Sequence, residues 1–331
     1  LNSTLISGKG VFVISFQVSS AFLVISNKPP PPKPSPSPRF FNNSAPSKGG
    51  GAFLLGGTML DNLVISGNTG NNRGGGLHIS GITTLINLIV ENNQAYSGAG
   101  IYIDQGSHVI SKSTINGNSA TYSGGGIHCY GSNVNIQEVF VSNNSAGLDD
   151  NESGSGGGIF IHGSPALENV TVNGNIVHNG NGGGIYIADN PTLNQIYVYG
   201  NYCSGSGGGL FGNGIISVSD FLFINNIADD NGGGIFIHGT TNHILSNVKI
   251  LSNIAENNGG GIYKSDCGGD PFTDVTIINN EANKGGGIYL KDGCMSISGH
   301  IEGNVAVIGG GVYFENTWSV SFTNVNIISN S

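Results

Sequence analysis

Residues 223–237 read Phe-Ile-Asn-Asn-Ile-Ala-Asp-Asp-Asn-Gly-Gly-Gly-Ile-Phe-Ile and contain the two markers that decide the fold. The first marker is a glycine triplet, and successive triplets start 24 to 32 residues apart. The second marker is an apolar residue followed three positions later by Asn. Two markers with one period are typical of a repeat protein. The triplets occupy residues 49–51, 74–76, 124–126, 156–158, 182–184, 207–209, 232–234, 259–261, 285–287 and 309–311, with Gly98-Ala99-Gly100 as a variant.

Both halves of the repeat have the pattern of short strands. Residues after a triplet, such as Ile235-Phe236-Ile237, and residues before the Asn, such as Val170-Thr171-Val172, alternate in character and are bounded by turn residues. At ~3.3 Å per residue, two or three such strands close a loop within one period, and loops stacked ~4.8 Å apart pair in parallel sheets. The sequence therefore predicts an all-β parallel β-helix, a solenoid of about 11 rungs, where a rung is one turn of the chain.

The repeated Asn has a structural explanation in this fold. A side-chain amide carries both donors and an acceptor, so Asn residues stacked ~4.8 Å apart in register bond to their copies above and below. We expect an Asn ladder along the whole solenoid, with a first possible member at Asn43. Its predicted members are Asn68, Asn93, Asn118, Asn144, Asn175, Asn201, Asn226, Asn253, Asn280, Asn304 and Asn330.

Composition excludes several other classes of protein. Charged residues make up 9% of the 331 residues and hydrophobic residues 37%, which excludes a disordered polyelectrolyte. The 57 glycines do not recur at every third position, which excludes collagen. The uncharged stretch from Val11 to Ser26 is short for a membrane span and is interrupted by polar residues, so we expect no membrane-spanning segment. We also expect no cofactor and no nucleic-acid partner.

The two markers resemble the repeats of a known family. The pairing of Gly-Gly-x-Ile/Leu/Val with Phe-x-x-Asn, as in Gly232-Gly233-Gly234-Ile235 and Phe223-Ile224-Asn225-Asn226, is similar to polymorphic outer-membrane proteins and related β-helical surface proteins. The resemblance covers residues 40–331. It implies a right-handed parallel β-helix displayed outside the cell, in a group whose members often serve as adhesins or surface structures. The third triplet position departs from that family, because it is usually Gly here and often Ala there.

Three segments divide the chain. Residues 1–27 contain Gly10-Val11-Phe12-Val13 and Val24-Ile25-Ser26-Asn27, which match the two strands of a rung, so we expect one detached N-terminal rung. Residues 28–39 are rich in Pro and predict a semi-rigid polyproline II linker, and residues 40–331 form the main solenoid. The linker resembles hydroxyproline-rich cell-wall glycoproteins, which implies glycans on its Ser-Pro residues, although an unmodified linker is an equal alternative. The implied sites are Pro34, Ser35, Pro36, Ser37 and Pro38.

Charge and phase predict how copies of the chain join. Residues 1–48 carry five basic residues and no acidic residue, whereas residues 49–331 carry six basic and 20 acidic residues, so the net charges are +5 and −14. The repeat continues to Ser331 without a recognisable cap, and uncapped strand edges pair with other chains. We therefore predict an extracellular structural protein, glycosylated, whose copies polymerise head-to-tail into a filament. In the alternative, residues 1–27 cap their own solenoid.

The second residue after each triplet is aromatic or His and, by strand alternation, faces away from the core. Such a column of rings predicts an assembly or glycan-binding face, and hence a second function as a cell-surface adhesin. The alternative is that stacking across rungs only stabilises the sheet. The predicted members of this face are Phe12, Tyr102, Phe160, Tyr186, Phe211, Phe236, Tyr263, Tyr289 and Tyr313.

Cysteines and glycosylation motifs indicate an extracellular or cell-surface location. Cys267 and Cys294 lie 27 residues apart at nearly equivalent positions on adjacent rungs, which predicts a disulfide and an oxidising compartment. Cys129 and Cys203 fall at inward positions, so we expect buried thiols. Asn-x-Ser/Thr motifs predict N-glycosylation at Asn2, Asn42, Asn143, Asn151 and Asn169.

A polysaccharide lyase or hydrolase is a third hypothesis, because β-helices include pectate lyases and polygalacturonases. The best acidic groups are Asp266 with Asp292 and Glu315, and Asp229 and Asp230 with Glu256. Each falls at or beyond a strand end, where solvated turn acids are common, so we expect no enzymatic activity and regard calcium binding as a weak alternative. The eight histidines do not gather in the sequence, so we expect surface residues and no metal site.

Overall fold

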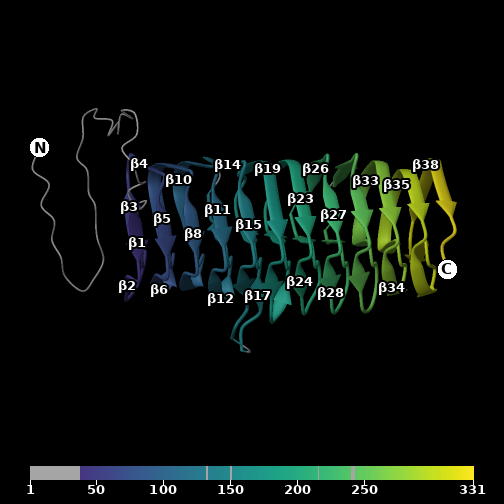
Figure 1. Ribbon diagram of the computed structural model, residues 1–331. Coiled ribbons are helices and arrows are strands. Elements are labelled where there is room, and N and C mark those ends of the chain that lie inside the picture. Colours follow the sequence, from purple (N-terminus) through teal and green to yellow (C-terminus); the bar gives the residue numbers. More distant parts are fainter. Residues whose placement is uncertain (1–37, 132, 150, 215, 240–242) are drawn as a thin grey trace, which may run out of the picture.

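The computed structural model describes residues 38–331 except residues 132, 150, 215 and 240–242, and it does not describe the side chains of residues 267–270. The prediction of an all-β, right-handed parallel β-helix of about 11 rungs is confirmed. In the described part of the chain every strand pair is parallel and there is no helix. The strands follow one another along a single axis (Figure 1).

Several sequence predictions fall on the N-terminal segment. The detached rung of residues 1–27, the linker residues 28–37 and six candidate sites lie outside the described residues. The first strand, β1 (Arg39–Phe41), starts one residue before the predicted boundary at residue 40. Pro38, the last proline of the linker, is exposed, and its carbonyl accepts a hydrogen bond from the Val64 amide at 3.0 Å. The six sites outside the description are Asn2, Phe12, Pro34, Ser35, Pro36 and Ser37.

One rung, residues 185–209, shows how the repeat folds. Strand β22 (Ile185–Ile187) turns Ile185 and Ile187 into the core and Tyr186 outward, as strand alternation requires. Strand β23 (Thr192–Tyr199) continues around the core, and β24 (Tyr202–Cys203) leads to the next glycine triplet. After that triplet, β25 (Leu210–Gly212) pairs in register with β22, so one period returns the chain to the same place one rung further along.

Each rung bends at three places, and a residue with positive φ lies at each bend. In this rung the three residues are Gln195 (φ 52°), Gly200 (φ 64°) and Gly207 (φ 75°). A Cβ on Gly207 would lie 2.6 Å from the Leu210 carbonyl oxygen, so only glycine fits there. A Cβ on Gly209 would lie 2.5 Å from the Gly234 carbonyl oxygen of the next rung. The triplet therefore makes a bend that requires glycine and permits close stacking of successive rungs.

Two parallel sheets run the length of the described solenoid. The larger sheet, with 25 strands among the described residues, consists of β1, β3 (Ala52–Leu55), β4 (Thr58–Asp61), β5 (Val64–Ser66), β7 (Leu77–Ile86), β8 (Ile89–Glu91), β10 (Ile101–Ser111), β11 (Thr114–Asn116), β13 (Ile127–Cys129), β14 (Asn133–Gln137), β15 (Phe140–Ser142), β18 (Ile159–Ile161), β19 (Ala166–Asn173), β22, β23, β25, β26 (Ser217–Ser219), β27 (Leu222–Ile224), β29 (Ile235–Ile237), β30 (Ile244–Ser246), β31 (Lys249–Leu251), β33 (Ile262–Ile278), β35 (Ile288–Glu302), β37 (Val312–Glu315) and β38 (Ser319–Ile328). The smaller sheet, with 13 strands in the same residues, consists of β2 (Ser44–Ala45), β6 (Thr69–Arg73), β9 (Gln94–Ser97), β12 (Ser119–Ser123), β16 (Ser145–Ala146), β17 (Gly154–Ser155), β20 (Ile176–Val177), β21 (Gly180–Asn181), β24, β28 (Ile227–Ala228), β32 (Ile254–Ala255), β34 (Glu281–Lys284) and β36 (Val305–Ile308).

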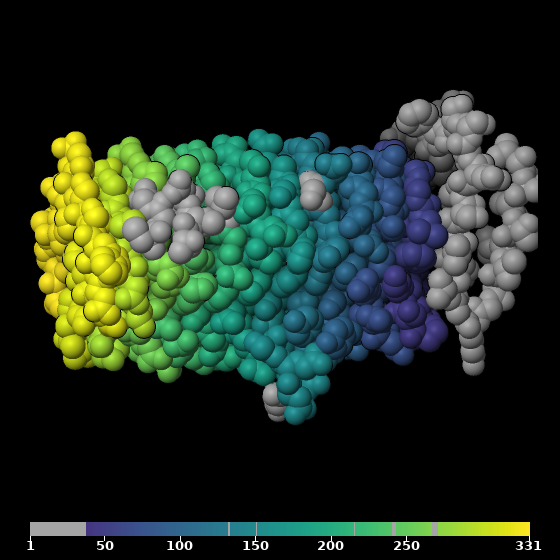
Figure 2. Space-filling model, turned by 180° about the vertical axis from the view of Figure 1, so that it is seen from behind, coloured from purple at the N-terminus to yellow at the C-terminus, as the bar shows by residue number. Residues whose placement is uncertain are grey.

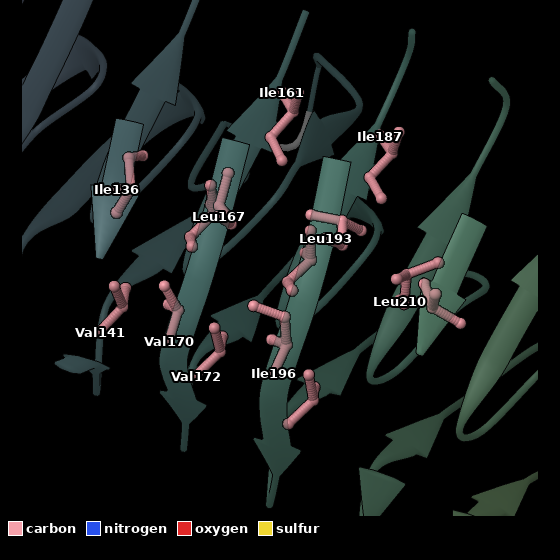
Figure 3. Packing of buried hydrophobic residues seen from close by; sticks show 14 of the residues in the cluster. Ile136, Val141, Ile161, Leu167, Val170, Val172, Ile187, Leu193, Ile196 and Leu210 are labelled. Carbon is pink, nitrogen blue, oxygen red and sulfur yellow. The ribbon is translucent and has the colours of Figure 1, made fainter. Parts of the chain in front are cut away.

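The core is a continuous column of aliphatic side chains inside the coil. Figure 3 shows residues of successive rungs, such as Leu167 and Leu193 or Val172 and Ile196, projecting from their strands into this interior. Most of these side chains are completely buried. The smaller sheet contributes a second cluster of small residues, including Ala120, Ala146 and Cys203. Because each rung covers the one before it, burial depends on neighbours about one period away in sequence.

The described chain is an elongated rod with its first strand and its C-terminus at opposite ends (Figures 1 and 2). The segment between β16 and β17 projects from the side of the rod (Figure 1). This projection corresponds to the longest insertion between two triplets, where successive triplets start 32 residues apart.

Candidate functional site

The ladder residues form one unbroken chain of side-chain hydrogen bonds. Asn201, for example, donates from its backbone N to Asn226 Oδ1 at 3.1 Å and from Nδ2 to the same oxygen at 2.9 Å. Its own Oδ1 accepts two bonds from Asn175, both at 2.9 Å, and its Nδ2 also donates to the Val172 carbonyl at 3.0 Å. The same Nδ2-to-Oδ1 bond links every consecutive pair from Asn43 to Asn330.

This ladder has a direction. In every bond between two ladder residues, the N-terminal member donates and the Oδ1 of the C-terminal member accepts. At the C-terminal end, no described residue accepts a hydrogen bond from the backbone N–H of Asn330. At the other end, no described residue donates to the side-chain oxygen of Asn43. Within the ladder the two faces of each rung are therefore complementary, because one face offers donors and the other an acceptor.

The predicted aromatic face is a column of rings that runs from Phe53 to Tyr313, in which Phe53 meets His78 edge to face and the rings from His78 onward are stacked. Successive ring centroids lie 4.6 to 5.3 Å apart. The prediction of an exposed face needs correction, because Tyr102 and Tyr289 are only 3% and 4% exposed and the other described members are half-buried. Each ring covers the faces of its neighbours, so only ring edges reach solvent. The half-buried predicted members are Phe160, Tyr186, Phe211, Phe236, Tyr263 and Tyr313.

Side chains near the triplets cover this column further. The Arg73 guanidinium lies 4.9 Å from the centroid of the Tyr102 ring, and Lys284 Nζ lies 5.5 Å from that of Tyr313. The hydroxyl of Ser123 lies 2.9 Å from Nδ1 of His128, a ring within the column. The geometry thus favours the alternative that the column stabilises the sheet.

The expectation of surface histidines is wrong for half of them. His78 and His128 belong to the aromatic column, and His108 and His243 are also buried. Burial lowers the pKa of His128 to about 3, with a smaller contribution from the positive charge of Arg73. Burial, together with the charge of Lys48, lowers the pKa of His78 to about 4. The burial of His78 and His128 could have been anticipated from the sequence, because both lie two residues after a triplet, a position that they share with Phe and Tyr.

The candidate acidic residues mostly serve as hydrogen-bond acceptors for their neighbours. The Tyr202 hydroxyl donates to Asp229 and the Tyr289 hydroxyl donates to Glu315, each at 2.5 Å. The bond to Asp229 raises the pKa of Tyr202 to about 12. Asp266 lies 3.0 Å from Nδ1 of His238. Among the described residues there is no group of three or more His, Cys, Asp or Glu side chains that could hold a metal ion.

Lys264 was missed by the sequence analysis. It occupies an inward position, in register with the core residue Leu290, and its side chain is completely buried. Its Nζ donates to the Asp266 carbonyl at 2.6 Å. The long aliphatic stem of Lys fills the place of a core residue while the ammonium group reaches the turn.

The cysteines and glycosylation motifs lie as follows. Cys129 and Cys203 are free, completely buried thiols, and burial raises the pKa of each to about 12. Cys267 and Cys294 are Cα partners on β33 and β35, the arrangement that the predicted disulfide requires.

Four glycosylation candidates, Asn42, Asn143, Asn151 and Asn169, have exposed side chains. Asn151 lies on the projecting segment between β16 and β17.

A hollow of about 520 Å³ lies on the outside of the rod, lined by residues of β10 and β14 and of the turns after β13, β18 and β22. Tyr130 and His162 stack beside it with ring centroids 4.5 Å apart, and His162 Nε2 lies 3.6 Å from Asp189 Oδ2. Gly131 and Gly163 lie between Gln105 and Asp189 in the lining. The sequence analysis did not single out this place, because its residues come from four separate rungs.

The last rung exposes residues of the core type. Ile297 and Ile301 are 1% and 0% exposed, whereas Phe322 and Ile327, their register partners one rung later, are 42% and 40% exposed. Trp318, at the same end, is 81% exposed. The same positions are buried in the earlier rungs except at Phe40 and Leu60, and Phe322 and Ile327 are exposed because the described residues include no rung beyond them.

Comparison with known proteins identifies two repeat families. A family model described as a right-handed beta helix region matches residues 38–203 and 150–273. A second model, the repeat of the Chlamydia polymorphic membrane protein, matches residues 274–291. Neither the curated proteins nor the solved structures that were compared with the chain gave a match. In the residues that the structure describes, no helix has the length and apolar character needed to cross a membrane.

Proposed function

Because the chain belongs to the right-handed β-helix family, we propose that it is a non-catalytic structural protein of the cell surface whose copies join end to end into a filament. The match to a polymorphic membrane protein repeat is consistent with a cell-surface or adhesin-like role. The observation that carries the filament proposal is that the described rungs all stack in one direction, so the two faces of a rung differ and one face fits the other. Any β-helix end that is left exposed offers unpaired strand edges and uncovered core residues to another chain.

The direction of the Asn ladder supports head-to-tail rather than head-to-head contact. A rung added after Asn330 continues the ladder only if it supplies an Asn side-chain oxygen in register. Asn27 is the residue that would supply this oxygen. Asn2 and Asn330 occupy the same position within the repeat, and Asn27 follows Asn2 by one repeat length, as the next ladder residue would follow Asn330. We therefore propose that residues 1–27 of one copy cover the last rung of the next.

Charge supports the same pairing of ends. Residues 1–48 carry a net charge of +5 and residues 49–331 one of −14, so the N-terminal segment is attracted to the body of another copy. Exposed charges are screened at physiological salt, so this attraction directs the encounter more than it stabilises the contact. The stabilisation comes from burial of the apolar end surface.

The experiment compares the full chain with two variants by negative-stain electron microscopy and sedimentation velocity. Deletion of residues 1–39 removes the proposed donor segment, and Phe322→Arg places a charge on the end surface. Both are expected to give single rods, whereas the full chain gives filaments. Phe140→Arg is the matched control, because Phe140 is similarly exposed, at 37%, but lies on the side of the rod.

Two outcomes contradict the proposal. Filaments that persist both in the deletion and in Phe322→Arg would show that other surfaces make the contact. A full chain that stays a single rod at all concentrations would show that the ends do not associate. Circular dichroism of Phe322→Arg establishes that the rest of the solenoid is still folded.

Glycosylation is part of the same proposal. The exposed side chains of Asn42, Asn143, Asn151 and Asn169 support modification at these positions, and Asn151 on the projecting segment is the most accessible to a transferase. Peptide mapping of secreted material before and after enzymatic removal of N-glycans measures the occupancy. The predicted glycans on the Pro-rich linker, and its resemblance to hydroxyproline-rich glycoproteins, stay a prediction.

A further inference from the structure

Two rows of residues, in register across four rungs, run along the hollow on the side of the rod. The first row contains Asp104, which lies within β10, and Tyr130, His162 and Ala188, which directly follow β13, β18 and β22. The second row contains the next residue of each rung, namely Gln105, Gly131, Gly163 and Asp189. Two glycines without side chains thus lie between two polar side chains, and the missing side chains leave the hollow open.

We infer that this hollow binds a neutral oligosaccharide of two or three pyranose units. Its volume of about 520 Å³ lies within the ~300–1,000 Å³ that is typical of small-molecule sites. Gln105 and Asp189 are three rungs apart, or roughly 14 Å at ~4.8 Å per rung. An elongated hollow with polar side chains at both ends suits a short chain of linked rings better than a single compact molecule.

Tyr130 supplies the apolar surface that a sugar ring requires. Its side chain is 41% exposed, and one face of its ring is stacked on His162. The other face is directed toward the preceding rung, where Asp104 takes the equivalent place, and no described ring stacks on that face. This differs from the rings from Tyr102 to Tyr289 of the aromatic column, which have a stacked ring on both faces. The C–H groups of a pyranose pack against a free aromatic face of this kind.

The polar side chains around the hollow match hydroxyl groups. Gln105 and Asn133 are exposed amides that both donate and accept hydrogen bonds, and Asp189, 43% exposed, accepts from two adjacent hydroxyls. The net charge of −14 on residues 49–331 repels acidic polysaccharides. Neutral sugars are therefore the class that this surface favours.

The test is saturation-transfer NMR and calorimetric titration with maltose, lactose, cellobiose and chitobiose as probes. At least one probe is expected to bind the full chain, with saturation transferred to its ring protons. Tyr130→Ala is expected to weaken binding roughly tenfold or more, as loss of a stacked aromatic contact predicts. Tyr197→Ala is the matched control, because Tyr197 is 39% exposed on another strand and is expected to leave binding unchanged.

A second variant fills the hollow without removing a binding group. Gly131 does not have a left-handed backbone, and a Cβ there would lie 3.2 Å from the Asp104 carbonyl oxygen, so Gly131→Ala needs only a small adjustment. Gly131→Ala is expected to weaken binding of the probe that binds the full chain. Absence of binding by all four probes, or equal binding by Tyr130→Ala and Tyr197→Ala, would overturn the inference. The hollow lies on the side of the rod, so the Phe322→Arg variant binds the probe whether or not the ends associate.

Discussion

At the scale of single residues, the Asn ladder shows how a polar side chain is accommodated in an apolar coil. A buried amide is costly unless both its donors and its acceptor are satisfied. Asn253 meets this condition because Asn226 and Asn280, one rung away on either side, carry the same side chain. Each member is thus stabilised by its neighbours, and replacing one of them affects two more.

Asn201→Ala is therefore expected to lower the free energy of unfolding by about 3 kcal/mol or more. The change leaves both Asn175 donors and the Val172 carbonyl without their partner, and each unsatisfied buried group costs ~1–3 kcal/mol. Urea denaturation followed by circular dichroism measures the loss. Asn257→Ala is the control, because Asn257 is exposed, its amide bonds only to Asp230, and a change within about 0.5 kcal/mol is expected. Equal losses in the two variants would contradict the ladder's role.

The buried histidines predict a loss of stability in acid. His128 has a pKa of about 3 in the folded chain and about 6.5 when unfolded, so between these pH values the unfolded state binds the extra proton. The free energy of unfolding is thus fully maintained above pH 6.5 and decreases as the pH falls toward 3. One such group contributes a slope of about 1.4 kcal/mol per pH unit within this window.

His128→Phe keeps a ring in the column but removes the titrating group. Its free energy of unfolding is expected to fall less steeply between pH 6 and pH 4 than that of the parent chain, as measured by urea denaturation across this range. Phe160→Leu, at the adjacent position of the column, is the control, because it weakens stacking and leaves the slope unchanged. A parent-like slope in His128→Phe would show that this histidine does not carry the effect.

At the scale of elements, two adjacent residues have different roles where a strand ends and the chain bends. In the pair Asn225-Asn226, the first residue adopts φ 53° and makes the bend, while the second enters the ladder. Where the first residue is Gly200 or Ser252, φ is again positive. Asn and Gly tolerate this conformation better than other residues, which explains why Asn pairs recur in the sequence. The glycosylation motifs at Asn42 and Asn143 arise from the same bend.

The pairing of β33 with β35 predicts a defined pattern of thiol reactivity. Cys267 and Cys294 are Cα partners there, whereas Cys129 and Cys203 are free and buried. Native, unreduced protein is expected to react with a maleimide at no cysteine, denatured unreduced protein at two, and denatured reduced protein at all four. Mass spectrometry counts the labels at each stage. Four labels before reduction would contradict the disulfide.

At the scale of the whole molecule, the solenoid keeps a single direction from its first described rung to its last. All rungs are parallel and the ladder bonds point one way, so the two ends are different surfaces. Contact between unlike ends does not close on itself and produces filaments, whereas contact between like ends produces closed dimers. The charge contrast between the basic residues 1–48 and the acidic residues 49–331 supports our proposal of the first kind of contact.

The sequence alone was sufficient for the coil, its period and the aliphatic residues that face inward, although it did not reveal the inward Lys264. Ile235 and Ile237 follow a glycine triplet, alternate with Phe236 and are buried, as the pattern predicted. This information is local, because alternation, bends and triplets are encoded within about ten adjacent residues. The ladder could also be anticipated, since one residue type recurs at the same phase in every rung.

Only the tertiary structure decided which outward residues are covered and where a hollow forms. Tyr102 and Tyr130 are both outward aromatic residues of consecutive rungs, yet one is 3% and the other 41% exposed. The difference depends on what lies one rung above and below, which is His78 and His128 for Tyr102, and Asp104 and His162 for Tyr130. Those neighbours are 24 to 32 residues away and vary from rung to rung. The local pattern determines the direction of a side chain, but stacking determines its exposure.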